Sequence, residues 1–257
     1  MRYNVDLRKE PINIAFIVLD SLRYDIAYKA LTPNIDKLGK FTQAWSCGWF
    51  TLPVHLALFH NAWLPQSTKP GIYNYKTERW FQVFNVRTHH PGLGIRHHYR
   101  IHDDVNFVKA LESLGYETVG IGGVSWFDTR ACLSREIWRQ FFKDGIHWQT
   151  DFSEKVSGAF ENQLAYMEGL LLPKKEKLFF FINISDTHMP YSFRGQMPAI
   201  HYVDSHFPKL LSLLPKPIHI FVFADHGDCR GEDGLYGHKI YHPKLLEVPI
   251  LNRIIEA

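Results

Sequence analysis

The sequence predicts a doubly wound α/β sandwich, and two observations carry this prediction. Three apolar runs read as strands that are buried on both faces, at residues 12–19, 178–185 and 218–224. Helical patterns lie between these runs, and strands that alternate with helices are typical of a sheet covered by helices on both faces.

The other main elements follow from local signals. A helix is expected to begin at Thr51-Leu52-Pro53, because proline is favoured in a first helical turn. Residues 117–121 read as a further short strand. Longer helices are expected at residues 153–172 and 199–214, and Pro208 is expected to strain or interrupt the second of them.

The composition is that of an ordinary globular domain. The 257 residues are 46% hydrophobic and 21% charged, which suits a single domain over residues 1–257 with a full core. A net charge of +3 is too small to indicate nucleic acid as a partner. The N-terminus lacks the apolar region of a signal peptide, and no apolar run reaches membrane-spanning length. The sequence therefore predicts a cytoplasmic protein that binds neither nucleic acid nor membrane.

Residues 64–102 break the regular pattern. Proline, glycine, tyrosine, arginine and histidine crowd together there without periodicity, which predicts a long irregular excursion from the core. This excursion could be a lid whose basic side chains meet an anionic substrate, or a solvated basic loop. The sequence leaves both interpretations open.

An aspartate ends each of the three predicted core strands. These residues are Asp20, Asp186 and Asp225, the last followed directly by His226. The carboxyl ends of parallel strands meet at one edge of a sheet, where open α/β sheets bind ligands. Carboxylates that converge there would repel one another unless a cation lay between them. The sequence therefore predicts a metal site at the carboxyl edge of the sheet.

Thr51 is the candidate nucleophile. It lies at the start of an apolar helix, whose free N–H groups and dipole favour an anion. Its hydroxyl could therefore attack a phosphoryl or sulfuryl centre. The alternative is that Thr51 only caps the helix, and the three strands that end in aspartate favour the nucleophile.

Motifs from end to end of the chain carry a family resemblance. In chain order they are IAFIVLDSLRYD, LTPNIDKL, FTQAWSCGWFTLPVHLALFHN, FVKALESLGYETVGIGG, NISDTHMPY, AIHYVDSHFPKLLSLL, and FVFADHGDCRGEDGLYGH with EVP. Together they resemble the sulfatase branch of the alkaline phosphatase superfamily. The resemblance implies a three-layer α/β/α sandwich with a mainly parallel central sheet and a divalent metal at its carboxyl edge.

The resemblance also implies roles for individual residues. The implied metal-contacting residues are Asp20, Thr51, Asp225 and His226. The implied catalytic residues are Thr51 as nucleophile and His188 and His238 as substrate-binding or proton-transferring groups. The ion would be Mn, Zn, Mg or Ca, since oxygen donors and one imidazole suit such cations. One ion is expected rather than two, because Asp186-Thr187-His188 is shorter than the Asp-x-x-x-His pair of two-metal members; Asp186 and His238 remain reserve ligands.

Departures from the family pattern narrow the expected activity. Sulfatases mature a Cys or Ser in C/S-x-P-x-R, whereas this chain has Thr51-Leu52-Pro53-Val54-His55. Where sulfatases carry a Lys and a His for the sulfate, this chain has Gly122-Gly123-Val124-Ser125. A threonine at the nucleophile position looks more like the phosphodiesterases and phosphoethanolamine transferases of the superfamily, so phosphate esters are favoured over sulfate esters.

We therefore expect a metal-dependent hydrolase of phosphate mono- or diesters, which forms a covalent phospho-enzyme on Thr51 and acts on a small anionic ester. The alternatives are a sulfatase or a phosphoryl-group transferase of the same superfamily. A non-enzyme alternative is a catalytically degenerate sulfatase-like domain that binds an anion or a partner. It is favoured by the altered TLPVH segment and by the expected absence of the C-terminal subdomain of sulfatases after Glu247-Val248-Pro249.

Overall fold

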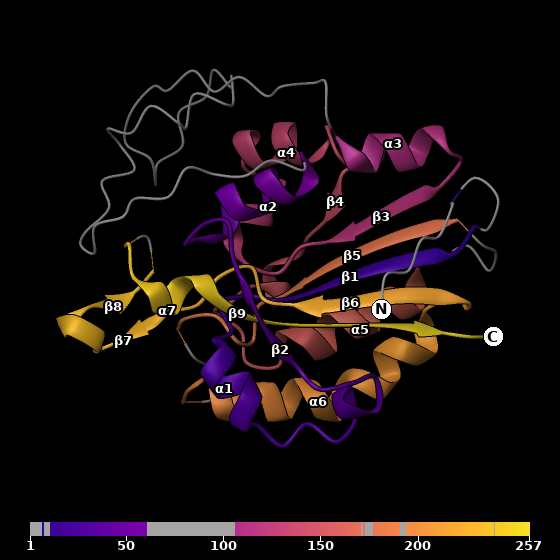
Figure 1. The fold of residues 1–257 in the computed structure, drawn as a ribbon. Helices are drawn as coiled ribbons and strands as arrows, with labels where there is room; N and C mark the ends of the chain where they lie inside the picture. The colour runs from indigo at the N-terminus through magenta and orange to yellow at the C-terminus, as the bar shows by residue number, and fades with distance from the viewer. Residues whose placement is uncertain are drawn as a thin grey trace.

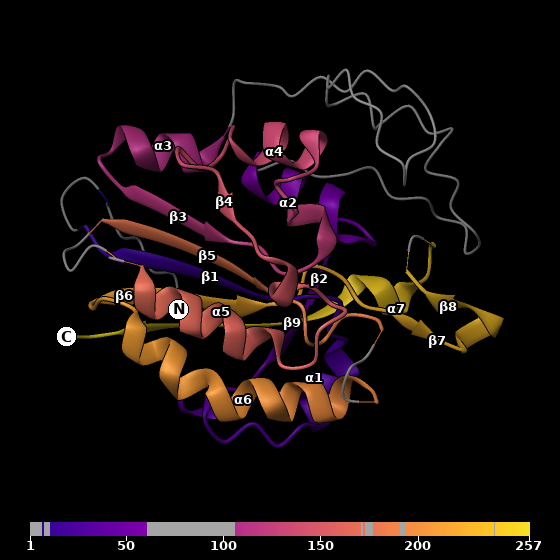
Figure 2. The same ribbon diagram turned by 180° about the vertical axis from the view of Figure 1, so that it is seen from behind.

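The structure is a computed structural model that describes residues 7, 11–60, 106–170, 172, 177–190, 194–238 and 240–257. The predicted excursion at residues 64–102 lies outside these described residues. A seven-stranded sheet forms the middle layer, and helices cover both of its faces (Figures 1 and 2). The predicted three-layer α/β/α sandwich is confirmed.

The central sheet has the strand order β2-β9-β6-β1-β5-β3-β4. Its strands are β1 (Asn13–Leu19), β2 (Thr42–Trp45), β3 (Glu117–Ile121), β4 (Ile146–His147), β5 (Leu178–Ile184), β6 (Ile218–Phe223) and β9 (Glu247–Ile255). Strand β1 pairs in parallel with β5 and β6, and parallel pairing continues through β3 to β4. Only β9 runs antiparallel to its neighbours, β6 and β2, among the described strands of this sheet. The sheet is therefore mainly parallel, as the sequence predicts.

Two helical layers pack on the sheet through separate apolar cores. One face carries α2 (Thr51–Phe59), α3 (Phe107–Ser113) and α4 (Cys132–Trp138), and the other carries α1 (Tyr24–Lys29), α5 (Ala159–Gly169) and α6 (Gln196–Leu213). Successive residues of a strand point to opposite faces. Accordingly, Phe179 and Phe181 of β5 belong to the first core, and Phe180 and Ile182 belong to the second. All seven residues of β5 are buried.

Short elements gather beyond the carboxyl ends of the parallel strands. They are a small ribbon of β7 (Cys229–Arg230) and β8 (Tyr236–Gly237), the 3-10 turn η5 (Glu232–Gly234) and α7 (Pro243–Leu246). Figure 1 shows the ribbon and α7 past the arrowheads of β1, β5 and β6. Three further 3-10 turns are η1 (Ile35–Lys37), η3 (Ser125–Phe127) and η4 (Thr150–Phe152). The edge of the sheet that the sequence marks as functional is therefore enclosed by these short elements.

The structure corrects some predicted boundaries. The helix predicted at residues 153–172 begins only at Ala159, because Gly158 adopts a left-handed conformation with φ of 78°. Helix α6 begins at Gln196 and continues through Pro208, which the sequence had predicted to strain or interrupt it. Strands β2 and β9 were not predicted. Neither has the uninterrupted apolar character of the central strands, and β9 contains Pro249.

Candidate metal and nucleophile site

Asp20 is the first residue after β1, and its side chain is fully buried. One carboxylate oxygen, Oδ1, accepts a hydrogen bond of 2.9 Å from the Ser21 hydroxyl. The other, Oδ2, accepts one of 2.8 Å from the side-chain amide of Asn183, on the neighbouring strand β5. These bonds fix the direction of the carboxylate.

Asp225 lies just beyond the end of β6, the other neighbour of β1. Its Oδ1 accepts hydrogen bonds from the backbone N–H groups of Ser21, at 3.0 Å, and His226, at 2.9 Å. Its Oδ2 is buried and has no hydrogen-bond partner among the described residues. A buried carboxylate oxygen without a partner is costly, so this atom is a candidate ligand for a cation.

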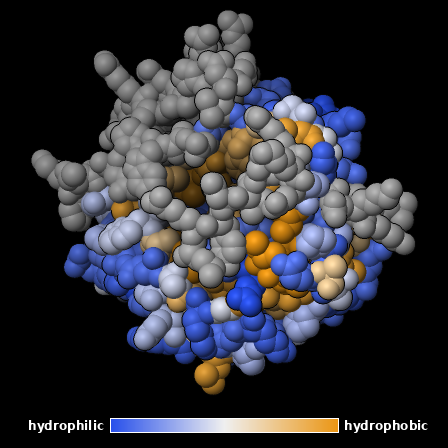
Figure 3. Space-filling model, turned by 45° about the vertical axis from the view of Figure 1, so that its right-hand side comes forward, coloured by the Kyte–Doolittle hydropathy of each residue, from blue (hydrophilic) through white to orange (hydrophobic). Residues whose placement is uncertain are grey.

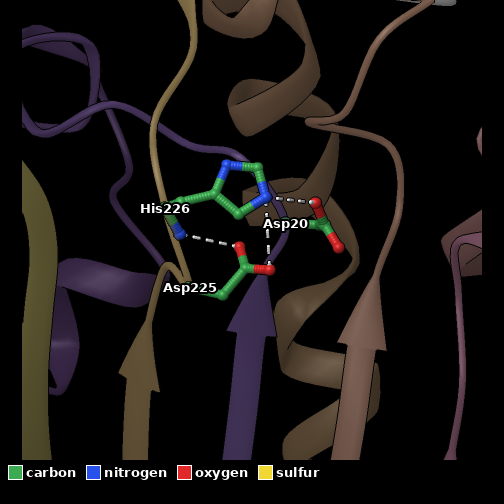
Figure 4. A group of neighbouring side chains, drawn as sticks. All are labelled: Asp20, Asp225 and His226. Atoms are coloured by element: carbon green, nitrogen blue, oxygen red, sulfur yellow. Dashed lines mark hydrogen bonds and ion pairs between the residues drawn. The ribbon is translucent and has the colours of Figure 1, made fainter. Parts of the chain in front are cut away.

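His226 faces both carboxylates (Figure 4). Its Nδ1 lies 2.8 Å from the Gly227 carbonyl, which can only accept, so Nδ1 carries the hydrogen and Nε2 presents a lone pair. This Nε2 lies 3.6 Å from Asp225 Oδ2 and 3.8 Å from Asp20 Oδ1. Burial, followed by the neighbouring His238, lowers the pKa of His226 to about 3, against the opposing effect of Asp20. The imidazole is therefore neutral at pH 7, as a metal ligand must be.

The donor atoms of these three residues fit one small divalent cation. Asp20, Asp225 and His226 each offer an atom, and these atoms all lie within 4.8 Å of one another. Donors held about 2.1 Å from a tetrahedral ion lie about 3.4 Å apart. The separations of 3.6 and 3.8 Å between the imidazole and the carboxylates are close to that value. Converging lone pairs in a buried site repel one another unless a cation lies between them, so the donor set is suited to a divalent metal.

Thr51 directs its hydroxyl into the same cluster. It is the first residue of α2 and is fully buried. Its Oγ1 lies 3.3 Å from His226 Nε2 and 3.4 Å from Asp20 Oδ2. The N-cap position of α2 is occupied by Phe50, so the structure does not support the alternative in which Thr51 is only a cap. The hydroxyl is therefore available to act together with the predicted metal ligands.

His188 and His238 lie on the outer side of this cluster. The Nε2 atom of His188 is 4.0 Å from Asp20 Oδ1, and its side chain is 12% exposed. The His238 ring centroid is 4.9 Å from those of both His188 and His226. Asp228 accepts a hydrogen bond from His238 Nδ1 at 3.0 Å. All six predicted site residues are therefore brought together, while their chemical roles stay predictions.

Asp186, which the sequence left as a reserve ligand, turns away from this cluster. Its Oδ2 accepts a hydrogen bond of 2.8 Å from the N–H of Phe160, in the first turn of α5. Burial raises the pKa of Asp186 to about 6, although hydrogen bonds from this turn favour the ionised form. The third aspartate at a strand end therefore caps a helix in this structure.

Sequence reasoning missed two residues that hold the cluster in place. Asn183 is a fully buried polar residue inside the apolar strand β5, and its amide oxygen also accepts from the N–H of Val124 at 3.2 Å. Ser21 links both carboxylates through its N–H and its hydroxyl, with φ of 61°, a conformation that is uncommon for a residue with a side chain. Asn183 could have been identified as the one polar residue within LFFFINI. Ser21 had no comparable signal in the sequence.

The segment after β3 cannot hold the side chains with which sulfatases bind their substrate. A Cβ atom added at Gly122 would lie 2.1 Å from Phe127 Cβ. One added at Gly123 would lie 2.4 Å from the Asn183 carbonyl oxygen. Both contacts are far too close, so these positions are restricted to glycine by packing.

Apolar surface also borders the site. Asp225 contributes to a cavity of about 260 Å³ that lies between α2 and strands β2, β6 and β9. Among the described residues, its lining includes no Lys, Arg or His, so these residues do not favour an anionic group there. Exposed Met189 follows His188, and exposed Tyr236 lies on β8, near His238. On the face shown in Figure 3, apolar areas lie within a largely hydrophilic described surface.

Comparison with known proteins supports the fold. No model of a protein family and no curated protein matches the chain. Among solved structures, the C-terminal periplasmic domain of phosphoethanolamine transferase EptC from Campylobacter jejuni matches with a TM-score of 0.54 and 14% identity, over 94% of this chain and 78% of that one. The corresponding EptC domain from Escherichia coli, in complex with Zn, matches with a TM-score of 0.59 and 14% identity, over 96% and 74%.

A third match is described as a protein in the alkaline phosphatase superfamily from Vibrio parahaemolyticus, with a TM-score of 0.56 and 16% identity, over 96% of this chain and 61% of that one. At these identities the likeness shows the fold alone. The resemblance to the alkaline phosphatase superfamily is therefore confirmed at the level of the fold. A Zn complex of one match and the donor set formed by Asp20, Asp225 and His226 are both consistent with a divalent metal.

The predicted cytoplasmic location is contradicted by these matches. The two EptC structures are periplasmic domains, and another match is an integral membrane phosphoethanolamine transferase from Neisseria meningitidis. The lack of a signal-peptide pattern was the basis of the prediction, and a domain that follows an anchor in a longer protein needs no such pattern. In the part of the chain that the structure describes, no helix has the length and apolarity needed to cross a membrane.

Proposed function

Because the chain has the fold of the alkaline phosphatase superfamily, we propose that it is a metal-dependent phosphoryl-transfer enzyme in which Thr51 attacks a phosphate mono- or diester and water completes hydrolysis. One observation carries the proposal: the buried Thr51 hydroxyl lies 3.3 Å from His226 Nε2 and 3.4 Å from Asp20 Oδ2. This position supports attack by the hydroxyl beside a cation held by Asp20, Asp225 and His226.

In the proposed reaction, the ion stabilises charge and the side chains carry out the attack and the proton transfers. A divalent cation held by Asp20, Asp225 and His226 would supply positive charge, which lowers the pKa of an adjacent hydroxyl and offsets charge on the phosphoryl group. Thr51 Oγ1 forms a bond to phosphorus while the ester P–O bond breaks, and the hydroxyl proton passes to solvent. The departing oxygen takes a proton from His188 or His238. Water then attacks the phosphorus, the bond from phosphorus to Oγ1 breaks, and Thr51 regains a proton.

Phosphate esters are favoured over sulfate esters by the surroundings of the nucleophile. A threonine cannot be matured to the formylglycine of sulfatases. The packing at Gly122 and Gly123 also excludes the larger side chains that bind sulfate in that family. The histidines on the outer side of the cluster remain available to an anionic substrate.

Transfer to an alcohol is the second candidate, and the names of the matched structures favour it, because several are phosphoethanolamine transferases. Hydrolysis and transfer share the attack by Thr51 and differ only in the acceptor. Turnover of an aryl phosphodiester in the presence of glycerol would separate them. A transferase should yield mainly the glycerol adduct, and a hydrolase should yield mainly the product of water attack.

The test of the nucleophile is the rate of hydrolysis of p-nitrophenyl phosphate and its bis-aryl diester with Zn²⁺, Mn²⁺, Mg²⁺ or Ca²⁺. We expect Thr51→Ala to lower kcat at least about 1000-fold, equivalent to about 4 kcal/mol of barrier. Thr51→Ser keeps a hydroxyl and should retain part of the activity. Thr118→Ala is the distant control, since Thr118 bonds Glu112 on α3, outside the site.

Two results would contradict the proposal. Full turnover by Thr51→Ala would exclude the threonine as nucleophile. Absence of hydrolysis with every metal, while phosphate still raises the melting temperature, would instead favour a degenerate domain that binds an anion.

A further inference from the structure

His55 contacts the backbone of the candidate nucleophile. It lies one helical turn after Thr51 on α2 and is fully buried. Its Nδ1 is 2.8 Å from the Thr51 carbonyl oxygen. A carbonyl oxygen can only accept, so Nδ1 must carry a hydrogen that it donates to Thr51.

The same nitrogen faces the candidate metal site. His55 Nδ1 lies 3.7 Å from Asp225 Oδ2, the carboxylate oxygen that has no hydrogen-bond partner among the described residues. Thr51 and Asp225 belong to different elements, helix α2 and the loop after β6, which lie far apart in the sequence. His55 therefore touches both the turn that carries the hydroxyl and the carboxylate expected to bind the cation.

The rest of the imidazole lies in an aromatic cage. Its ring centroid is 5.3 Å from that of Phe127 and 5.5 Å from that of Phe181, and both contacts are edge-on. The Nε2 atom is buried and has no hydrogen-bond partner within the described part of the chain. A leucine or phenylalanine would fill such a cage without burying a polar nitrogen, so packing alone does not account for a histidine here.

We infer that His55 is a positioning residue, whose Nδ1–H holds the first turn of α2 at a fixed place relative to Asp225, so that the Thr51 hydroxyl stays aimed at the cation. This inference rests on the proposed function. The field of the Nδ1–H also opposes movement of the Asp225 carboxylate away from the cluster. Outer groups of this kind commonly change metal affinity or activity by about 10- to 100-fold when they are removed.

The decisive comparison is between His55→Asn and His55→Leu. Asparagine places its amide donor near the position of Nδ1, whereas leucine fills a similar volume and has no donor. We expect His55→Leu to raise the Kd for Zn²⁺ or Mn²⁺, measured by calorimetry, at least about 10-fold. His55→Asn should stay within about 3-fold of the unaltered protein. For p-nitrophenyl phosphate esters, His55→Leu should lower kcat with little change in KM, and His55→Asn should restore most of it.

Two further variants keep the test decisive. If His55→Leu does not fold, His55→Gln serves in its place, because its donor lies nearer the position of Nε2 and should not restore metal affinity. His60→Asn is the matched control: His60 is a buried histidine at the end of the same helix, beside Phe141, and its loss should leave the Kd for the metal unchanged.

Two measurements test the inference without depending on turnover: the tautomer of His55 and the affinity for the metal. Spectra of the protein with 15N-labelled histidine should show His55 as the Nδ1–H tautomer, and an Nε2–H tautomer would overturn the inference. Equal loss of metal affinity in His55→Asn and His55→Leu, or no loss in either, would also overturn it. If the protein binds metal but hydrolyses no ester, the proposed function fails, while metal affinity and tautomer still test the position of His55.

Discussion

The aspartates that follow β1 and β6 have different partners from the aspartate that follows β5, although all three lie on the same edge of the sheet. Asp20 and Asp225 point toward His226 and Thr51, and one oxygen of Asp225 has no partner among the described residues. Oδ2 of Asp186 instead accepts the N–H of Phe160 in the first turn of α5, and although its Oδ1 also has no partner among the described residues, this carboxylate is directed away from the cluster. A strand end therefore fixes where a carboxylate lies, whereas the groups around it fix what it binds.

The two outcomes follow from the partners that each carboxylate meets. Helix N–H groups carry partial positive charge and bind one oxygen of Asp186 without a metal. Burial outweighs this effect and raises the pKa of Asp186, so its protonated form is favoured relative to an exposed carboxyl group. Asp20 and Asp225 instead lie beside a neutral imidazole, and Asp225 Oδ2 has no donor among the described residues, so a cation would stabilise this group of converging acceptors. β5 still contributes to the site, but through Asn183 and not through its aspartate.

The largest effect that this comparison predicts is at Asp225. Asp225→Asn keeps an oxygen that can accept from Ser21 and His226, and it removes the charge. We expect the Kd for Zn²⁺ or Mn²⁺ to rise at least about 100-fold and hydrolysis to fall at least about 1000-fold, since the cation loses a charged ligand. Asp186→Asn is the matched control. Equal losses of metal affinity in Asp225→Asn and Asp186→Asn would contradict the conclusion that only the first of these aspartates binds the cation.

The next effect is at Asn183. Asn183→Leu has nearly the same volume but leaves Asp20 without its amide donor and Val124 without its acceptor. We expect metal affinity to fall about 10- to 100-fold and the free energy of unfolding to fall by about 1–3 kcal/mol. Calorimetric titration and urea unfolding measure the two. Unchanged metal affinity would mean that β5 has no part in holding Asp20.

Asp186 should control stability and its pH dependence. Its pKa in the folded protein, about 6, lies above its ordinary value of 3.8. The stability linked to this group is therefore fully present below about pH 4 and is lost as the pH rises through 6. Relative to Asp186→Asn, the unaltered protein should lose on the order of 2 kcal/mol of unfolding free energy between pH 4 and pH 7. Urea unfolding of both proteins at these two pH values measures this loss. If the unaltered protein instead gained stability relative to Asp186→Asn between pH 4 and pH 7, the assignment would be contradicted.

The smallest effect is expected at Glu232, on the outer rim. Burial opposes ionisation of this side chain, but the Arg230 N–H and the Arg23 guanidinium outweigh burial and lower its pKa to about 2. Its contribution to stability is present above about pH 4.5 and is lost as the pH falls through 2. Glu232→Gln should cost about 1 kcal/mol at pH 7 and leave metal affinity unchanged. A large change in metal affinity would show that the rim helps to hold the buried donors.

The sequence predicted the sheet and the aspartates at its edge because buried strands have a strong local pattern and end abruptly. It could not predict the direction of Asp186, since that depends on where the first turn of α5 lies. Asn183 and His55 were also missed, because Asn183 bonds Asp20 and Val124 and His55 faces Asp225, and these partners lie far away in the sequence. Strands β2 and β9 were missed for a related reason. They are shorter or less apolar than the central strands, and the pairing of β2 with β9 and of β9 with β6 stabilises them more than their own composition does.

The central claim is that Asp20, Asp225 and His226 hold one divalent cation beside Thr51. Anomalous diffraction from crystals grown with Zn²⁺ or Mn²⁺ and vanadate tests it most directly. The account predicts a single peak about 2.0–2.2 Å from Asp20, Asp225 Oδ2 and His226 Nε2, with vanadate bound to Thr51 Oγ1. A peak elsewhere, or vanadate bound away from Thr51, would contradict it.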